Sequence, residues 1–260
     1  MSLYITALNS GSNGNCYYVG NKKEAVLIDV GISCTAVEKR LAVLGLPISK
    51  VKAIFVSHEH TDHTKGVSTL ANKYQIPVYI SGETARHGPR LISHLAINFE
   101  AHQPITIGDL EVTAFNKCHD ASDPHSFVIS SNGVTVGVFT DHGKVCDHTI
   151  QYFKKCHAAF LESNYDETML QNGPYADILK NRIRGGLGHL SNAQAVALFK
   201  AHRPPFMTHL LLAHLSSRNN TAEIASQLFL PHAGNTEIIV ASRLQASPVY
   251  TISAMSEVVI

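Results

Sequence analysis

The chain has 260 residues, of which 45% are hydrophobic and 16% charged, and its formal net charge is +1. A mean hydropathy near zero and the absence of any apolar run near the ~18 residues of a membrane span exclude a membrane protein and indicate a soluble globule. Because the net charge is so small, binding of a polyanion would depend on local basic patches.

Short strands and helices alternate over the first hundred residues. Apolar or β-branched runs at 4–8, 17–19 and 25–28 lie between Gly, Ser and Asn clusters and predict strands. Residues 35–44 and 64–73 show helical spacing, and the apolar runs 51–56 and 78–80 predict two further strands. The turn-rich segment 10–15 is interpreted as a tight turn, with an anion-binding nest of backbone donors as the alternative.

Two hairpin signals follow, at Gly108-Asp109 between runs 105–107 and 110–115, and at Asn132-Gly133 between runs 126–130 and 134–139. Beyond them we expect helices at 147–154, 192–201 and 221–229, and strands at 158–162, 206–213 and 237–240. Hairpins and helix crossovers in both halves favour two mixed sheets stacked face to face with helices outside. Without a repeat or a Pro-rich linker, we expect one domain over residues 1–260.

The five cysteines are scattered and include no Cys-x-x-Cys pair, which argues against a disulfide framework and against a thiolate zinc site. The amino terminus has no basic stretch followed by an apolar signal core, so we expect a cytoplasmic protein.

The segment His58-Glu59-His60-Thr61-Asp62-His63 places three imidazoles and a carboxylate just after the predicted strand 51–56. This mixture of nitrogen and oxygen donors suits first-row divalent metals, and its spacing suits two ions better than one. His58 and His60 would face the same way in extended chain, whereas Asp62 and His63 fall past the strand end. A polar loop that is rich in histidine by chance is the alternative.

Four ligands are too few to complete the coordination of two metal ions, so further His or Asp residues are expected at strand ends. His119, Asp141 and His214 each occupy such a position, where open sheets present site residues.

Together these residues resemble the metallo-β-lactamase superfamily, whose motifs they reproduce in order along with Asp29 of Leu27-Ile28-Asp29-Val30-Gly31. Gly188-His189-Leu190-Ser191-Asn192 and His214-Leu215-Ser216-Ser217-Arg218 resemble late motifs of RNase Z and of PhnP-type phosphodiesterases. With the segment 10–16, the combination looks most like the YycJ (WalJ) group of nucleic-acid hydrolases. The resemblance implies an α/β, four-layer αββα sandwich and a centre of two divalent metal ions.

Carried over from the family, His58, His60 and His119 would hold one ion, Asp62, His63 and His214 the other, and Asp141 would bridge them. Asp29 would orient the metal loop by hydrogen bonds. His189 matches a proton donor of the RNase Z group, with Glu162 as its partner, and we count His189, Asp62 and Glu162 as catalytic. A turn histidine without a catalytic role is the alternative for His189.

Two cations that share a water generate hydroxide near neutral pH and clamp the attacking and leaving oxygens of a phosphodiester. Arg182, Arg184 and Arg218 are candidates for binding flanking phosphates, although a basic run such as 180–184 is also typical of a solvated helix face. Zinc is the default metal, manganese a rival and iron a further option. A redox di-iron protein is disfavoured, because that branch has Glu where this chain has His60.

We therefore expect a nuclease, in particular an exonuclease, that acts on DNA or RNA. Hydrolysis of a small carbonyl ester, thioester, lactone or cyclic phosphodiester is the alternative, and a non-enzymatic binding module is a third hypothesis. Roughly 70 residues separate Asp141 from His214, fewer than a typical ~100-residue domain, so we expect no β-CASP or other clamp domain there. Fold analogy suggests a homodimer.

Overall fold

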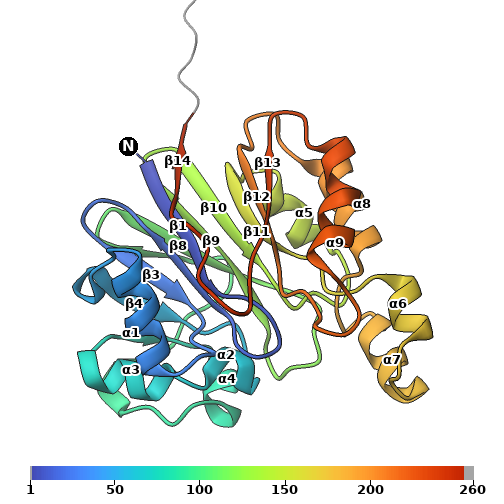
Figure 1. The fold of residues 1–260 in the computed structure, drawn as a ribbon. Helices are drawn as coiled ribbons and strands as arrows, with labels where there is room; N and C mark the ends of the chain where they lie inside the picture. The colour runs from blue at the N-terminus through green and yellow to red at the C-terminus, as the bar shows by residue number, and fades with distance from the viewer. Residues whose placement is uncertain (1, 255–260) are drawn as a thin grey trace, which may run out of the picture.

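Two seven-stranded mixed sheets form the centre of the computed structural model, which describes residues 2–254 (Figure 1). The first sheet has the order β14-β1-β2-β3-β4-β5-β6, made of β1 Ser2–Asn9, β2 Cys16–Gly20, β3 Ala25–Ile28, β4 Val51–Phe55, β5 Val78–Tyr79, β6 Ala96–Ile97 and β14 Tyr250–Ser253. The second has the order β13-β12-β11-β10-β9-β8-β7, made of β7 Pro104–Ile107, β8 Leu110–Asn116, β9 His125–Ser131, β10 Val134–Phe139, β11 Ala158–Glu162, β12 His209–Ala213 and β13 Glu237–Val240.

Each sheet is antiparallel at one end and parallel at the other. In the first sheet β14 to β3 pair antiparallel and β3 to β6 pair parallel. In the second, β7 to β10 pair antiparallel and β10 to β13 pair parallel. The parallel halves need crossover connections, and each of these connections contains at least one helix.

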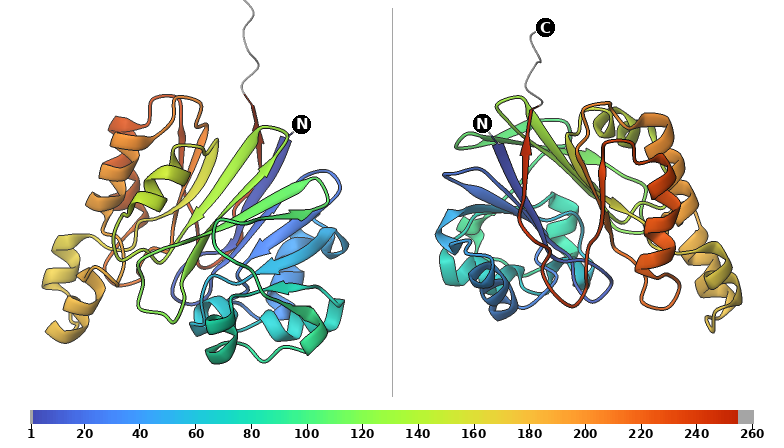
Figure 2. Two further views of the ribbon diagram at one scale, coloured as in Figure 1. Left: turned by 180° about the vertical axis from the view of Figure 1, so that it is seen from behind. Right: turned by 45° about the horizontal axis from the view of Figure 1, so that its top comes forward.

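Helices cover the outer face of each sheet, as Figures 1 and 2 show. The first sheet is covered by α1 Cys34–Val43 and α3 Val67–Tyr74, with the short α2 Thr61–Thr64 and α4 Gly82–His87 beside them, and the second by α5 Asp147–Phe153, α8 Asn192–His202 and α9 Ala222–Phe229. The pair α6 Glu167–Asn172 and α7 Asp177–Arg184 extends from the second half of the molecule. Single 3₁₀ turns occur at Ile48–Lys50, Ser93–Leu95 and Leu230–His232.

Strand periodicity distributes the apolar side chains over three core layers. In β2, for example, Tyr17 and Val19 pack between the sheets, whereas Cys16 and Tyr18 pack under the outer helices. Both faces of this central strand are therefore buried, which explains its uninterrupted apolar composition. The structure confirms the prediction of two mixed sheets with helices on their outer faces.

Most predicted elements appear, and some bounds differ. Strands 25–28, 158–162 and 237–240 match β3, β11 and β13, and both hairpin signals join paired strands. The helix predicted at 64–73 is wrong in its start, because α2 ends at Thr64 and Lys65-Gly66 separates it from α3. The strand predicted from 206 begins only at His209. The helices α2, α4, α6 and α7 and the strands β6 and β14 were not predicted from the sequence.

All five cysteines lie within the described residues and are free thiols, as expected. No helix within residues 2–254 is both long enough and apolar enough to cross a membrane.

The chain segment after β3 passes directly against the His58–His63 loop. The Gly31 amide donates to the Asn15 carbonyl oxygen at 2.7 Å, and the Asn15 amide donates to the Asp62 carbonyl oxygen at 2.7 Å. A Cβ atom on Gly31 would overlap the Asp62 carbonyl, so only glycine permits this close approach.

We predict that Gly31→Ala lowers the free energy of unfolding by at least about 1–3 kcal/mol, because backbone rather than a flexible side chain must move. Gly82→Ala is the matched control, since a Cβ at Gly82 would meet its nearest atom at 3.7 Å. Urea unfolding followed by circular dichroism measures both changes. Equal midpoints for Gly31→Ala and the unaltered protein would contradict the prediction.

Candidate metal centre

The strand ends of both sheets bring the seven predicted ligands together at one edge of the sandwich. His58 and His60 follow β4 in the loop that leads into α2, and Asp62 and His63 lie within α2. The other three come from the second sheet, where His119 follows β8, Asp141 follows β10 and His214 follows β12.

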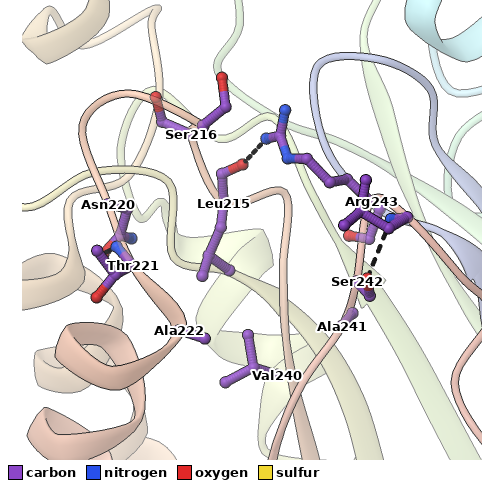
Figure 3. Close-up of a pocket in the computed structure, with 12 residues that line it drawn as sticks. Leu215, Ser216, Asn220, Thr221, Ala222, Val240, Ala241, Ser242 and Arg243 are labelled. Carbon is purple, nitrogen blue, oxygen red and sulfur yellow. Dashed lines mark hydrogen bonds between the residues drawn. The ribbon is translucent and has the colours of Figure 1, made fainter.

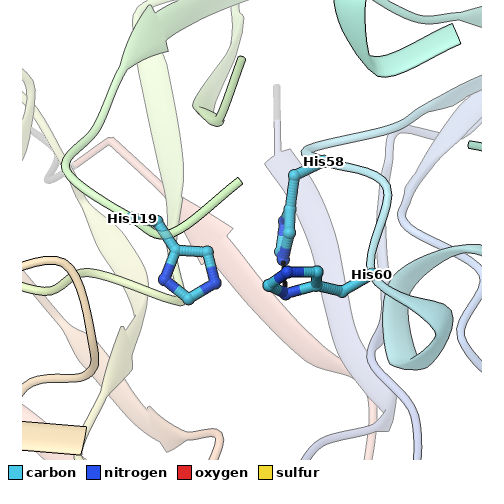
Figure 4. A group of neighbouring side chains, drawn as sticks. All are labelled: His58, His60 and His119. Carbon is cyan, nitrogen blue, oxygen red and sulfur yellow. Dashed lines mark hydrogen bonds between the residues drawn. The ribbon is translucent and has the colours of Figure 1, made fainter. Parts of the chain in front are cut away.

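His58, His60 and His119 form the first group of potential ligands (Figure 4). Each offers a ring nitrogen within 4.8 Å of the other two. The His58 Nε2 and His60 Nδ1 atoms are 3.1 Å apart, as expected for residues two apart in extended chain that face the same way.

Asp62, His63 and His214 form the second group, with the same 4.8 Å limit between their ligand atoms. Asp141 lies beside both groups: its Oδ2 is 3.1 Å from His63 Nε2, and its Oδ1 is 3.9 Å from His119 Nε2. His214 Nδ1 lies 3.0 Å from Asp141 Oδ1.

Hydrogen bonds to Nδ1 leave Nε2 as the ligand atom of the buried histidines. The Nδ1 atom of His58 is 2.8 Å from Ser57 Oγ, that of His63 is 2.7 Å from Asp29 Oδ2, and that of His119 is 3.1 Å from the Gly188 carbonyl oxygen. Such contacts fix the tautomer and the ring orientation of metal-binding histidines. The arrangement therefore fits divalent cations.

Two buried nitrogen atoms without a hydrogen-bond partner in the described part of the chain also indicate a cation site. His119 Nε2 and His214 Nε2 are buried and form no hydrogen bond with any part of residues 2–254. Buried polar groups in proteins nearly always have a partner, and an ion is one of the explanations for an exception.

Electrostatics also favour positive charge at this site. Burial lowers the pKa of His58 well below its usual range and that of His119 to about 4, so both rings stay neutral and able to bind a cation. Burial acts in the same direction on His63, but the carboxylates of Asp141 and Asp29 outweigh it and raise the pKa of His63 to about 10. The same carboxylates would stabilise a divalent cation.

Asp29 binds Ser57, which precedes His58 and was not among the residues predicted from the sequence. The Asp29 carboxylate accepts from the Ser57 amide and from the Ser57 hydroxyl, both at 2.8 Å. Asp29, Asp141 and His214 have φ values of 59°, 57° and 54°, a left-handed conformation that costs free energy for non-glycine residues. These strand-end turns aim the three side chains into the site.

The partly exposed His189 and the buried Glu162 form a hydrogen-bonded pair next to the predicted ligands. His189 Nδ1 lies 2.8 Å from Glu162 Oε1, and His214 Nδ1 lies 3.2 Å from the same oxygen. Although burial raises the pKa of Glu162, the charge of His189 outweighs it and lowers that pKa to about 2. The carboxylate is therefore the acceptor, and His189 keeps Nε2 for contact with a bound molecule.

A cavity of about 250 Å³ opens over these residues. Its lining includes His60, Asp62, His119, Asp141, His189 and His214, together with Ser12, Asn164, Tyr175, Leu179, Arg182, Ile183 and Ser216. Leu179, Arg182 and Ile183 belong to α7, which thus forms one wall.

The three predicted phosphate-binding arginines occupy different surroundings. Arg182 lines the metal cavity and donates from Nε to Asp120 at 2.6 Å. Arg184 lies two positions further along α7, where residues do not share a face, and it lines a separate cavity with Tyr165 and Gln194. Arg218 is exposed on the loop between β12 and α9. Binding of substrate by these side chains stays a prediction.

The loop 10–15 contains the expected turn, in which the Gly14 amide donates to the Gly11 carbonyl oxygen at 2.8 Å. It also brings Asn15 into the site, with Nδ2 3.0 Å from His63 Nε2. The interpretation as a turn accounts for the backbone but missed this side chain, whose only signal was its position in a family motif.

Comparison with known proteins gives a consistent result. The family model described as "Metallo-beta-lactamase superfamily" matches residues 10–156. An exodeoxyribonuclease YycJ of Bacillus anthracis is 36% identical over 229 residues, which cover 86% of this chain and 87% of the relative. An exodeoxyribonuclease WalJ of Streptococcus pneumoniae is 32% identical over 227 residues, which cover 84% of this chain and 83% of the relative.

Among solved structures, the metallo-beta-lactamase fold protein YhfI from Bacillus subtilis matches with a TM-score of 0.73. The match has 20% sequence identity and covers 96% of this chain and 99% of YhfI. At this identity the likeness shows a shared fold.

We predict that Ser57→Ala weakens Zn²⁺ or Mn²⁺ binding by roughly 10–100-fold, because His58 Nδ1 and the Asp29 carboxylate lose the hydroxyl that orients them. Ser49→Ala, on the exposed turn before β4, is the control. Competition titration with a chromogenic chelator measures the affinity. Equal metal affinities for Ser57→Ala and Ser49→Ala would rule out this positioning role.

Proposed function

Because this chain belongs to the metallo-beta-lactamase superfamily, we propose that it is a metal-dependent phosphodiester hydrolase that acts as an exonuclease, with DNA as the first candidate substrate. The observation that carries the proposal is a hydrogen-bonded pair, His189 and Glu162, beside two groups of residues that could hold metal ions, at a cavity that His189 lines. The relatives named exodeoxyribonucleases support it, since they match most of this chain.

His58, His60 and His119 would hold one ion, Asp62, His63 and His214 a second, and Asp141 would contact both. When bound, two cations supply Lewis-acid stabilisation of the negative charge that develops on phosphate oxygens and lower the pKa of a bound water. Zinc and manganese both suit this donor set, and iron is a further option.

His189 is the proposed proton donor to the leaving alkoxide. Glu162 accepts a hydrogen bond from the Nδ1–H group of His189, which orients the ring and leaves Nε2 as the nitrogen that faces a substrate. Glu162 is fully buried and also accepts from the His142 amide at 2.7 Å, so the position of the carboxylate is fixed. We count Asp62 with this pair, since it lines the same cavity.

The walls of the cavity suit a nucleic-acid strand. Arg182 would contact a phosphate, and the polar side chains of Ser12, Asn164 and Ser216 in the same lining would offer hydrogen bonds. Tyr175 is the aromatic side chain in the lining other than histidine, and it is available for stacking on a base. The net charge of +1 supplies no general attraction, so affinity would come from these local contacts.

Hydrolysis of end-labelled single- and double-stranded DNA and RNA, with Zn²⁺ or Mn²⁺, tests the proposal. Asp141→Ala serves as the inactive control, and a thioester substrate tests the carbonyl-ester alternative. Turnover of the thioester with no cleavage of any nucleic acid would replace the proposed function. The expected homodimer is a separate prediction, which sedimentation analysis tests.

We predict that His189→Ala retains the metals but loses roughly 10²–10⁴-fold in the rate of DNA hydrolysis, the usual size of a general-acid contribution. Hydrolysis of bis-p-nitrophenyl phosphate should change far less, since its leaving group departs without a proton. Metal analysis and rates on both substrates give the comparison, with His148→Ala, on α5, as the control. An unchanged DNA rate for His189→Ala would remove this residue from the mechanism.

A further inference from the structure

A second cavity adjoins the metal centre and has no role in the mechanism described above. Its volume is about 310 Å³, within the roughly 300–1,000 Å³ of small-ligand sites. It lies beyond the carboxyl ends of the parallel strands β12 and β13, between the segments 215–222 and 240–244 (Figure 3). Ser216 lines both cavities, so one bound molecule can reach from the metal centre into this pocket.

The pocket is polar at one end and apolar at the other. Figure 3 shows the side chains of Ser216 and Arg243 at one end, and Ala222, Val240 and Ala241 toward the other. No carboxylate is among its lining residues. The polar end is the end that includes the shared residue Ser216.

The Arg243 side chain is a cation without an anionic partner in the described part of the chain. Its Nη2 donates to the Leu215 carbonyl oxygen, and no ion pair among residues 2–254 includes this guanidinium. Burial lowers the pKa of Arg243, although an arginine stays charged at neutral pH. A partly desolvated, unpaired guanidinium with free N–H groups is suited to bind phosphate.

The loop that carries Arg243 is held rigidly from two sides. Asn13 Nδ2 donates to the Arg243 carbonyl oxygen at 3.1 Å, and Arg40 Nη2 donates to the Leu244 carbonyl oxygen at 3.1 Å. The Ser10 amide donates to the Ser242 carbonyl oxygen at 3.1 Å. Ser10 Oγ in turn accepts from the amide of the ligand His214 at 2.8 Å, so this loop is tied to the metal centre.

Two further donors are available at the same pocket. Ser216 Oγ accepts from the Asn219 amide at 3.2 Å, and Ser242 Oγ accepts from the Leu244 amide at 3.0 Å. Each hydroxyl therefore retains its own proton for a bound acceptor. The amino-terminal end of α9 offers few further donors to a bound molecule, because its Ile224 amide already donates to the Thr221 side chain.

We propose that this pocket is a subsite for the nucleotide next to the scissile phosphate, with its phosphate on Arg243 and Ser216 and its sugar and base against Ala222, Val240 and Ala241. The subsite rests on the proposed function, because it assigns the pocket to the substrate of that same centre. Arg243 is a substrate-binding residue here and takes no part in the bond cleavage.

Two variants test the two ends of the pocket. Arg243→Gln removes the cation, and Ala222→Leu fills the apolar end from the exposed first turn of α9. Arg243→Gln should raise KM for a DNA oligonucleotide roughly tenfold, the size expected for one charge-assisted hydrogen bond, with kcat little changed. Ala222→Leu should raise KM by a similar factor, because the leucine side chain would occupy the space of the sugar and base. Arg243→Lys should recover part of the loss. Kinetics on bis-p-nitrophenyl phosphate should stay unchanged, because that substrate has no flanking nucleotide.

The matched controls are Lys200→Gln, which removes a charge from the exposed face of α8, and Gln227→Leu, which adds an apolar side chain elsewhere on α9. Unchanged KM values for both pocket variants would overturn the subsite and leave the proposed function standing. So would equal losses on DNA and on bis-p-nitrophenyl phosphate, since these indicate general damage to the fold.

Binding of a labelled, hydrolysis-resistant phosphorothioate oligonucleotide, measured by fluorescence anisotropy, separates the two proposals. If the unaltered protein cleaves no phosphodiester but binds this probe roughly tenfold more tightly than Arg243→Gln and Ala222→Leu do, the pocket stands and the proposed function fails. If the unaltered protein does not bind the probe, or if the pocket variants bind it equally well, the subsite is overturned.

Discussion

The contact of Asp141 with His63 and His214 joins the two sheets at the metal centre. Asp141 and His214 come from strand ends of the second sheet, whereas His63 comes from α2, which follows β4 of the first. The contacting atoms, His63 Nε2 and His214 Nδ1 on either side of the Asp141 carboxylate, lie 3.1 and 3.0 Å from its oxygens, so a small shift of one sheet against the other would separate them. The apolar layer between the sheets therefore controls the geometry of the site as well as the stability of the fold.

Sequence reasoning succeeded where one strand determines the position of a side chain. Strand ends at Ile28, Glu162 and Ala213 follow from apolar runs, and ligands placed at such ends meet at one edge of each sheet. The signal for the hairpin at Asn132-Gly133 was also local, because these two turn residues favour the pairing of β9 with β10. The grouping of the seven predicted ligands, in contrast, came from family motifs, because no local signal indicates which strand ends lie side by side.

The remaining parts of the site depend on contacts far apart in the sequence. The helices α6 and α7 have six and eight residues, too few for strong periodicity, and a cap at Asp166 with docking of Arg182 on Asp120 stabilises them. Arg182 and Arg184 were predicted to act together because they are close in the sequence. Residues two apart on a helix lie on different faces, however, and the two side chains line different cavities. Arg243 belongs to no basic cluster, and it adjoins the centre only because β13 lies beside β12.

The carboxylates that would stabilise a bound cation also lower the stability of the fold when no cation is bound, because their negative charges are buried. Asp29, Asp141 and Glu162 are almost fully buried, and buried charge is tolerated only when paired or bound to a metal. A cation that binds the native state stabilises it by mass action, and the unfolded chain has no preformed site. Left-handed backbone at Asp29, Asp141 and His214 adds a further cost that the surrounding structure must offset. Stability and metal affinity are therefore linked through the same three strand-end turns, and substitutions in the apolar layer that loosen these turns should weaken both together.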